Sequence, residues 1–296
     1  MRRRMMQMAA GTTVLALALV GCGGSGKDGS AAPVADKPSF AAGTTMANIA
    51  NTGKIRVGIK FDQPGFGKQG LSGGYEGFDV EIAKVVAAGL GLKPDVIEYT
   101  EAPSARREEV IEAKKVDMVV ATYTINDKRK ERVSFAGPYY VAGQQLMVAK
   151  DDTKITSPES LKTNPDAKVC SVSGSTPGET IKKYLANPNQ LVLFDVYSKC
   201  ADALRTGQVQ AVTTDNVILL GFVSDSNGKF KLAGDQFTKE PYGIGIPKGD
   251  VPFCQFIDDQ LTKAAKSGAY EKAWTSTAGK VEGAKTPTLP PLDPCS

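Results

Sequence analysis

The chain contains no histidine among its 296 residues. This absence excludes Ser-His-Asp and Cys-His catalytic mechanisms, and it excludes zinc sites built on histidine. The five cysteines have no C-x-x-C spacing, so the sequence supports no metal site. Two glycine-rich lookalikes of phosphate-binding motifs within residues 21–29 neither follow a strand nor open a helix, and we therefore expect no cofactor.

A large excess of one charge is also missing. The chain has 36 basic and 32 acidic residues. Three of the basic residues lie within residues 1–21, so the rest of the chain has 33 basic residues against 32 acidic ones. A nearly neutral chain gives no reason to expect nucleic-acid binding. Its hydrophobic fraction of 41% is typical of a soluble globular protein, and its length allows two domains.

Residues 1–21 have the features of a bacterial lipoprotein signal peptide. Three arginines precede a short apolar core over residues 13–20, and Leu19-Val20-Gly21-Cys22 resembles a lipobox. Cleavage there would leave Cys22 as the mature N-terminus. Its acyl chains, such as palmitate, would anchor the protein to the outer face of the bacterial cell membrane. The alternative is an ordinary secreted protein with a chance cysteine at the cleavage site.

After the signal peptide, the sequence predicts a tether followed by two α/β units. Residues 22–48 are rich in Gly, Ser, Ala and Pro, which is typical of a flexible tether. Strands are then expected over 55–59, 95–99 and 116–121, with helices over 79–88 and 104–113. After an extended stretch at 139–149, strands are expected over 168–172, 191–194 and 211–214, with helices from 177, 198 and 216. Such alternation predicts parallel sheets with helices on their faces.

Four cysteines remain beyond Cys22. An even number of cysteines in an exported protein predicts two disulfides, and three pairings are possible. Two of the cysteines fall in the second α/β unit and two lie after it. We therefore favour the pairs Cys170–Cys200 and Cys254–Cys295.

The segment over residues 117–140 carries the clearest candidate site. A short apolar strand over 118–121 runs out into the hydroxyl residues Thr122 and Thr124. Asn126 or Asp127 can cap a following helix, which places Arg129 in its first turn. Hydroxyl groups and a guanidinium at the end of a parallel strand suit a small anion. The alternative is an ordinary turn with a solvated arginine.

This segment resembles the cluster-3 family of bacterial solute-binding proteins, which capture polar amino acids for ABC importers. Its members follow such a strand with T/S-I-x-x-x-R and then F-x-x-P-Y, and this chain has Thr124-Ile125, Arg129, Phe135 and Pro138-Tyr139-Tyr140 in those places. The run Gly77-Phe78-Asp79-Val80-Glu81-Ile82-Ala83 is similar to the opening helix signature of the family. The resemblance spans about residues 52–280.

The resemblance implies a two-lobed periplasmic-binding-protein fold. Each lobe would be a βα-wound sheet, and a two-strand hinge would join the lobes. Residues 49–142 with 241–282 would form lobe 1 and residues 143–240 would form lobe 2. Residues 283–296 would form an irregular C-terminal tail that Cys295 pins.

The resemblance also implies a binding site for a free amino acid between the lobes. Arg129 matches the residue that binds the α-carboxylate, and Thr124 and Thr122 match positions that add donors. In the second lobe, Ser175 and Thr176 match an anion-binding helix start, and Asp215 matches the acid that binds the α-ammonium. By spacing alone, residues 176–179 form a capping box and Asp215 can cap the next helix, so either feature can also be only a helix cap.

The ligand's side chain depends on Arg107. The run Ser104-Ala105-Arg106-Arg107 is similar to a family stretch whose arginine binds a side-chain carboxylate, although Glu108 or Glu109 can instead neutralise Arg107. Phe61, Phe66 and Tyr75 are candidates for an aromatic wall, of which we favour Phe61. Asp62 or Gln63 can also face the cleft, and Lys60 and Lys68 are alternative partners for an acidic side chain.

These features predict a lipid-anchored, extracytoplasmic and monomeric binding protein, not an enzyme. Its expected ligand is an acidic or amide amino acid, with glutamate favoured and aspartate, glutamine and asparagine next. Hinge closure would capture the ligand for an ABC permease and its ATPase. The alternatives are a ligand-sensing subunit of a signalling system and a dehydratase of the same fold.

Overall fold

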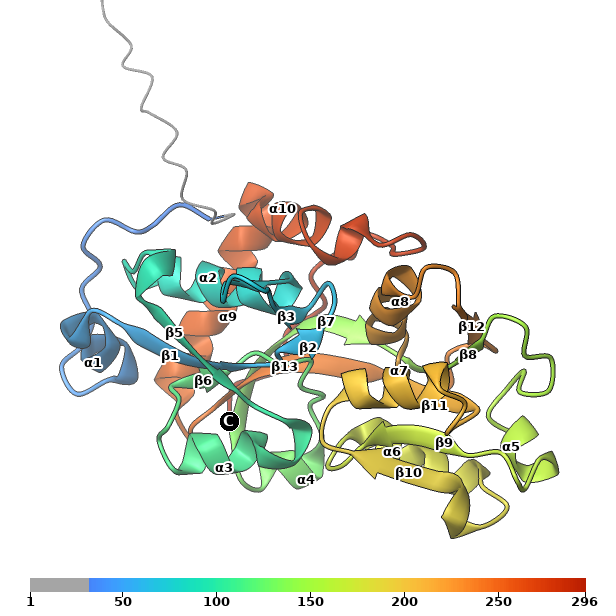
Figure 1. Ribbon diagram of the computed structural model, residues 1–296. Coiled ribbons are helices and arrows are strands. Elements are labelled where there is room, and N and C mark those ends of the chain that lie inside the picture. Colours follow the sequence, from blue (N-terminus) through green and yellow to red (C-terminus); the bar gives the residue numbers. More distant parts are fainter. Residues whose placement is uncertain (1–31) are drawn as a thin grey trace, which may run out of the picture.

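Two five-stranded sheets form two lobes that lie side by side in the computed structural model (Figure 1). The structure describes residues 32–296. The predicted signal peptide and the predicted lipidation site Cys22 lie outside the described residues. The two lobes confirm the predicted α/β fold.

The first sheet has the strand order β5-β1-β6-β13-β7. Strands β1, β5 and β6 are parallel, whereas β13 runs antiparallel to both β6 and β7. The strands are β1 (Ile55–Ile59), β5 (Ile97–Glu101), β6 (Met118–Val119), β7 (Ser134–Ala142) and β13 (Glu240–Ile246). The accompanying helices are α1 (Thr45–Thr52), α2 (Phe78–Gly89), α3 (Arg107–Glu112), α4 (Asp127–Lys130), α9 (Val251–Ser267) and α10 (Ala269–Thr275).

Short elements complete this half of the molecule. A small antiparallel sheet follows β1 and consists of β2 (Asp62–Gln63), β3 (Gly67–Gln69) and β4 (Tyr75–Glu76). Single 3-10 turns are formed by Pro94–Val96, Ser104–Arg106 and Ala278–Lys280. Gly77 is the N-cap residue of α2 and has a φ of 126°, and a Cβ atom there would lie 2.1 Å from the Phe66 carbonyl oxygen. Only glycine fits this position of the predicted helix signature.

The second sheet has the strand order β10-β9-β11-β8-β12. Strands β9, β10 and β11 are parallel, and β8 runs antiparallel to β11 and β12. The strands are β8 (Gln144–Ala149), β9 (Val169–Val172), β10 (Leu191–Phe194), β11 (Ala211–Asp215) and β12 (Phe230–Ala233). The helices are α5 (Ser160–Thr163), α6 (Thr176–Thr180), α7 (Tyr197–Arg205) and α8 (Asn216–Asp225), with 3-10 turns at Ile181–Tyr184 and Pro188–Gln190.

Two neighbouring antiparallel strands connect the lobes. The chain leaves the first sheet at the end of β7 and enters the second sheet as β8, and β13 returns it to the first sheet. Glu240 at the start of β13 pairs with Ala142 at the end of β7. The two crossings therefore lie side by side as the predicted two-strand hinge.

An aromatic cluster forms the centre of the first lobe. The ring centroid of Phe66 lies 6.0 Å from that of Phe78 and 5.9 Å from that of Tyr140. Trp274 of α10 stacks on Tyr140 at 5.1 Å. All four side chains are buried. This cluster ties the C-terminal helices to the strands of the first sheet, because buried aromatic rings contribute large apolar contact areas.

Residues 32–48 differ from the predicted flexible tether, because they pack on the first lobe. The Ala35 N–H donates a hydrogen bond to the Ala88 carbonyl at 2.8 Å, and the ring of Phe40 contacts that of Phe256 at 5.5 Å. Thr44 then caps α1. Composition favoured a linker here, but a few apolar side chains suffice to hold a short segment against α2 and α9.

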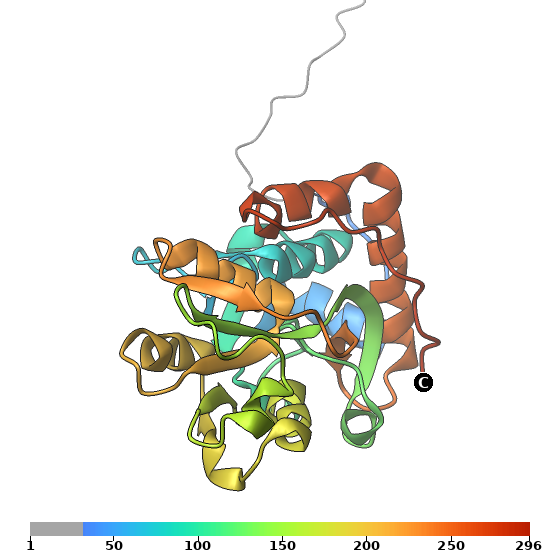
Figure 2. The same ribbon diagram turned by 90° about the vertical axis from the view of Figure 1, so that its right-hand side faces the viewer.

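The structure contains two disulfides, and they are the two pairs that the sequence favours. Cys170–Cys200 joins β9 to α7 in the second lobe, and Cys254–Cys295 joins α9 to the C-terminal tail. The tail runs down beside α9 (Figure 2). The hydroxyl of Ser134 in β7 donates a hydrogen bond to the Ser296 carbonyl at 2.7 Å.

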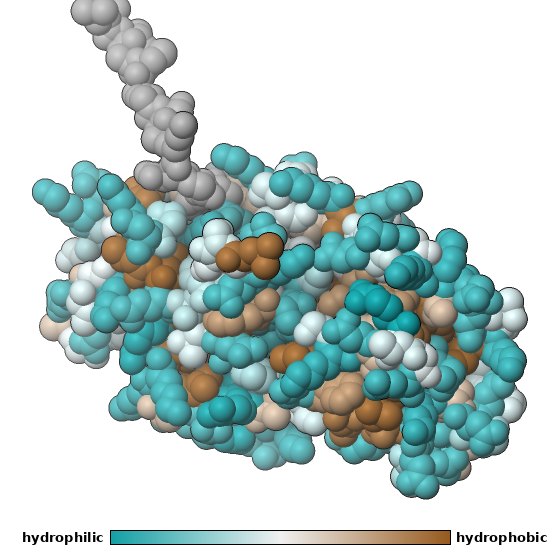
Figure 3. All heavy atoms as spheres, in the orientation of Figure 1, coloured by the Kyte–Doolittle hydropathy of each residue, from teal (hydrophilic) through white to brown (hydrophobic). Residues whose placement is uncertain are grey.

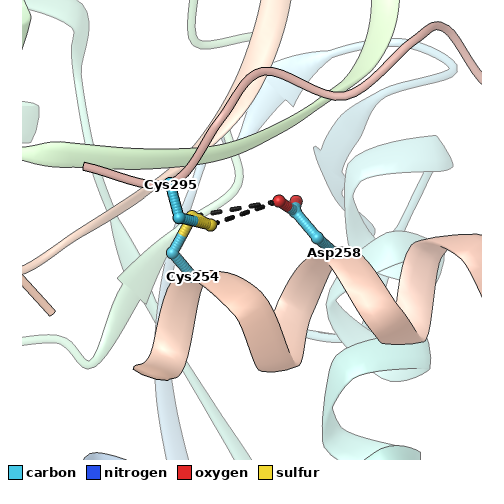
Figure 4. Close-up of side chains that lie close together, drawn as sticks. All are labelled: Cys254, Asp258 and Cys295. Carbon is cyan, nitrogen blue, oxygen red and sulfur yellow. Dashed lines mark hydrogen bonds between the residues drawn. A yellow bond between two sulfur atoms is a disulfide. The ribbon is translucent and has the colours of Figure 1, made fainter. Parts of the chain in front are cut away.

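The second disulfide faces a carboxylate, as Figure 4 shows. The Cys295 Sγ lies 3.3 Å from Oδ2 of Asp258, and the other oxygen of Asp258 accepts a hydrogen bond from the Gly137 N–H at 2.8 Å. Burial raises the pKa of Asp258 to about 6. These three side chains do not make a metal site, because the two sulfur atoms are bonded to each other and are not thiolates.

The described surface is mainly polar. Figure 3 shows a mostly hydrophilic face with separate small apolar patches. Within residues 32–296, no helix combines the length and the apolar character that crossing a membrane requires.

Candidate functional site

A narrow, buried cavity lies between the two lobes. Its lining comes from both, and most of the side chains are polar. The lining residues are Ser104, Arg107, Thr122, Thr124, Ser175, Thr176, Pro177, Tyr197, Thr214, Asp215 and Ile218. Six of the predicted site residues are therefore brought together, namely Arg107, Thr122, Thr124, Ser175, Thr176 and Asp215.

The loop after β6 forms one wall of the cavity. Thr122 has a left-handed backbone with a φ of 45°, which is unusual for a residue other than glycine. Its N–H donates to Oδ2 of the buried Asp79 at 2.9 Å, and Tyr139 donates its hydroxyl to the other oxygen of Asp79 at 2.6 Å. The amide of Thr122 is thus already used, and its hydroxyl has acceptors in the Gln63 side chain at 3.0 Å and the Ala121 carbonyl at 2.8 Å.

Arg107 lies in this wall and is almost completely buried. One guanidinium nitrogen donates to the carbonyls of Ala121 and Thr122, at 2.9 and 3.3 Å. The guanidinium also lies 4.2 Å from the centre of the Tyr123 ring. Glu108 and Glu109 form ion pairs with other arginines, so neither neutralises Arg107.

Arg129 does not line the cavity itself but contacts Thr124, which does. Asn126 caps α4 by accepting the Arg129 N–H, as expected. The Arg129 guanidinium donates to the Thr124 carbonyl at 2.6 Å and to the carbonyl of Gly174, in the second lobe, at 3.2 Å. Burial lowers the pKa of Arg129 to about 10, and the nearby positive charge of Arg107 contributes to this shift. Glu108, whose Oε1 lies 3.5 Å from Nε of Arg129, partly offsets this effect.

The start of α6 forms the facing wall, but its cap differs from the predicted one. Ser175 is the N-cap, and its hydroxyl accepts the Gly178 N–H at 3.0 Å. Thr176 begins the helix, so its hydroxyl is available for other partners. It lies 3.3 Å from the Thr124 hydroxyl of the first lobe and donates to Glu240 of the hinge at 2.7 Å.

Asp215 ends β11 and faces the cavity with a fully buried carboxylate. The hydroxyl of Tyr242 donates to Oδ2 at 2.6 Å, whereas Oδ1 has no hydrogen-bond partner. Asp215 stands at the N-cap position of α8, but its side chain makes no capping bond. Burial raises the pKa of Asp215 to about 7, and the negative charge of Glu240 adds to the shift.

Several buried polar atoms in the cavity wall lack partners. They are Nε of Arg107, Oγ1 of Thr214 and Oδ1 of Asp215. A buried polar atom without a hydrogen bond costs free energy, so three of them around one cavity indicate a site built for a polar ligand. Their charges suit a small molecule that carries both an anionic and a cationic group.

The aromatic candidates lie elsewhere. Phe61 packs on Tyr75, with ring centroids 4.8 Å apart, and it does not belong to the cavity lining. Phe66 is fully buried in the aromatic cluster. Gln63 contacts the Thr122 hydroxyl, and Asp62 accepts the Ser198 N–H of α7. A ligand role for Phe61 stays a prediction.

Three polar lining residues were not predicted to bind the ligand, namely Ser104, Thr214 and Tyr197. Ser104 enters the sequence analysis only as part of the stretch before Arg107. Ser104 and Arg107 are three residues apart, a spacing that places their side chains on one side of the turn. Thr214 directly precedes Asp215 at the end of a parallel strand, which is a recognisable signal.

Comparisons with known proteins identify the family of the chain. Residues 55–276 match the bacterial extracellular solute-binding proteins of family 3. The glutamate-binding protein GluB of Corynebacterium efficiens is 36% identical over 94% of this chain and 93% of its own length. The glutamine-binding protein GlnH of an ABC transporter in Bacillus subtilis is 36% identical over 86% of this chain and 90% of its own length.

Solved structures give the same result. A structure of an ancestral arginine-binding protein bound to glutamine has a TM-score of 0.71 and 34% identity, and the match covers 78% of this chain and 99% of that chain. These relatives are named as binding proteins, which agrees with the prediction that this protein is not an enzyme. The chain belongs to the bacterial extracellular solute-binding proteins of family 3.

Proposed function

We propose that the protein captures a free amino acid by closing its two lobes around it. Glutamate is the favoured ligand, with aspartate, glutamine and asparagine next. The observation that carries this proposal is the grouping of Arg107 and Asp215 in the lining of one buried polar cavity, with the buried Arg129 hydrogen-bonded to the carbonyl of the lining residue Thr124. Relatives named as glutamate-binding and glutamine-binding proteins support it.

The charged groups match an acidic amino acid one by one. Arg129 is assigned to the α-carboxylate, since a planar guanidinium can hold both oxygens of one carboxylate. The unpaired oxygen of Asp215 is assigned to the α-ammonium, and Arg107 to the side-chain carboxylate. Buried ions are costly unless each is paired, and such a ligand would pair Nε of Arg107 and Oδ1 of Asp215, which have no partner, while it would share Arg129 with that residue's present acceptors.

Closure of the lobes is supported by the polar contacts that cross the cleft. The hydroxyl groups of Thr124 and Thr176 form a hydrogen bond. The Arg129 guanidinium donates to the Gly174 carbonyl. Lys68 and Asp225 form an ion pair. Such contacts are replaced by water when the lobes separate, so opening has a low cost. The moving bodies in this proposal are residues 49–142 with 241–282, and residues 143–240.

Delivery to a membrane partner completes the proposal. The closed, loaded form would dock on an ABC permease whose ATPase hydrolyses the ATP. An acylated Cys22 would hold the protein at the outer face of the membrane, with the lipobox-like run over residues 19–22 as its support. Membership in an extracellular solute-binding family supports this extracytoplasmic location.

Calorimetric titration with the twenty amino acids tests the ligand assignment. We expect glutamate to bind most tightly and Arg129→Ala to abolish measurable binding, whereas Arg132→Ala leaves it unchanged. Arg132 is the matched control because it is an exposed arginine three residues further on, paired with Glu112. Equal binding by Arg129→Ala and the parent protein would overturn the assignment of the α-carboxylate.

A second variant pair tests the side-chain assignment. Arg107→Met is expected to weaken glutamate binding more than glutamine binding, because only glutamate carries the second negative charge. The neighbouring Arg106→Met is the control, since Arg106 is exposed and pairs with Glu109. An unchanged preference in Arg107→Met would contradict this role for Arg107.

A further inference from the structure

A carboxylate of the first lobe caps helix α7 of the second lobe. The N-cap residue of this helix is Val196, whose side chain makes no capping hydrogen bond. Instead, Oδ2 of Asp62 in β2 accepts the N–H of Ser198, the second residue of the helix, at 2.9 Å. A carboxylate at a helix N-terminus is stabilising, because it satisfies a free amide and interacts favourably with the helix dipole. The cap of α7 therefore crosses the cleft between the lobes.

The Asp62 side chain is directed at this helix and not at the cavity. Asp62 does not belong to the cavity lining, whereas the next residue, Gln63, contacts the lining residue Thr122. Successive side chains of a strand point to opposite sides, so β2 presents Gln63 to the cavity wall and Asp62 to α7. Within residues 32–296, no lysine or arginine forms an ion pair with Asp62.

Helix α7 is connected to the wall of the cavity. Its first residue, Tyr197, is a lining residue. Its Cys200 is joined by a disulfide to Cys170 of β9, the strand that precedes α6. An acceptor that fixes the start of α7 therefore also fixes one wall of the cavity relative to the first lobe.

The other polar contacts across the cleft are weaker or belong to the predicted ligand site. Lys68 and Asp225 form an ion pair, but their side chains are 39% and 49% exposed, and such surface pairs contribute little. The contacts through Thr124 and Arg129 belong to the ligand site. Asp62 is partly buried and its hydrogen bond is charge-assisted, which makes the bond stronger than one between neutral groups.

We propose that Asp62 is a positioning residue that holds the lobes closed, because it caps α7 when the lobes are together and loses this partner when they separate. This inference rests on the proposed function, since it assumes that ligand binding closes the lobes. Asp62 then sets the affinity without touching the ligand. Closure is common to every ligand, so loss of the cap lowers the affinity for all of them by the same factor.

The test is calorimetric titration of the full chain with glutamate and with glutamine. Asp62→Ala is expected to weaken the binding of both by about tenfold, and by the same factor. Asp62→Asn is expected to recover much of this loss, because its amide oxygen can still accept the Ser198 N–H. A residue that contacts the ligand side chain would instead affect the two ligands unequally, since only glutamate carries a second negative charge.

Asp195→Ala is the matched control. Asp195 is an exposed aspartate that precedes the same helix and pairs with Lys199, so its contacts lie within the second lobe and do not change on closure. We expect both affinities of this variant to equal those of the parent.

Melting temperatures separate the proposed role from a loss of folding. Without ligand, the Tm of Asp62→Ala is expected to equal that of the parent, because the open form lacks this cap in both proteins. The increase in Tm that a given concentration of glutamate produces is expected to be smaller in Asp62→Ala, since its affinity is lower.

The outcomes distinguish this inference from the proposed function. If the parent binds glutamate but Asp62→Ala keeps both affinities, or loses only one of them, the role of Asp62 is wrong and the amino-acid site stands. A lower Tm of Asp62→Ala without ligand would also overturn it, because the cap would then support the open form. If the parent binds none of the twenty amino acids, the proposed function fails and this inference fails with it.

Discussion

At the scale of single residues, Asp215 links ligand binding to stability. Its pKa is raised from 3.8 to about 7, so the folded protein binds this proton more tightly than the unfolded chain does. Stability therefore decreases as the pH rises from about 4 to about 7, because the unfolded chain gives up the proton first. The ligand ammonium needs the ionised form, so affinity is expected to fall as the pH drops below about 7.

Asp215→Asn separates these two effects. The variant removes a buried charge but keeps an oxygen that can accept from Tyr242. Without ligand at pH 8 its Tm is expected to exceed that of the parent by about 2–5 °C, and the difference should shrink toward pH 4. Amino-acid affinity is expected to fall by about tenfold or more. A lower Tm at pH 8, measured by calorimetric scanning, would contradict the predicted cost of ionised Asp215.

Ser175 and Thr176, which are adjacent at the start of α6, have different structural roles. Ser175→Ala removes the helix cap and is expected to lower the free energy of unfolding by about 1 kcal/mol. Thr176→Ala keeps the cap but loses the contacts with Thr124 and Glu240, so it is expected to weaken ligand binding more than stability. Thr176→Ser, which keeps the hydroxyl, serves as the control. Urea unfolding checks the assignment, and a larger loss of stability in Thr176→Ala than in Ser175→Ala would place the cap at Thr176.

The sequence predicts candidate site residues that stand at fixed distances from recognisable strands. Arg107, Arg129 and Asp215 belong to this group. It misplaced the α6 cap because serine and threonine cap equally well, and two of them in a row leave the helix start ambiguous by one residue. The sequence makes Lys60 an alternative partner for an acidic side chain, but its almost complete burial depends on packing that no local pattern records.

At the scale of elements, helix α8 of the second lobe contacts the turn between β2 and β3 of the first. A Cβ atom on Gly221 of α8 would lie 2.5 Å from the carbonyl oxygen of Pro64 in that turn. This contact exists only when the lobes are together, so the lack of a side chain at Gly221 permits closure.

Gly221→Ala is therefore expected to change affinity and stability in opposite directions. Alanine favours a helix over glycine by about 1 kcal/mol, so the Tm without ligand should stay the same or rise. The clash with Pro64 should weaken glutamate binding by about tenfold, since binding requires the closed form. Ser224→Ala, at an exposed position of the same helix, is the control. Unchanged affinity in Gly221→Ala, measured by calorimetry, would show that closure does not bring these elements together.

The order of strands and helices could be predicted because each βα unit has its own local periodicity. The strand expected over residues 116–121 is shorter than predicted, since β6 contains only Met118 and Val119. The polypeptide bends there, because Thr122 adopts a left-handed backbone that no hydrophobic pattern reveals. The packing of residues 32–48 also depends on contacts with distant helices, which composition does not encode.

At the scale of the whole molecule, two neighbouring strands join the two lobes. We expect the protein to sample open forms without ligand and to stay closed with glutamate. Small-angle X-ray scattering should then give a smaller radius of gyration when glutamate is added. Arg129→Ala should give no such change at the same glutamate concentration. An identical scattering curve with and without glutamate, under conditions where calorimetry detects binding, would contradict capture by hinge closure.

The most direct measurement is a crystal structure of the protein with glutamate. We expect the ligand in the cavity between the lobes, with its α-carboxylate on Arg129, its ammonium on the free oxygen of Asp215 and its side-chain carboxylate on Arg107. Glutamate bound outside this cavity, or bound with its side chain away from Arg107, would contradict the proposed site.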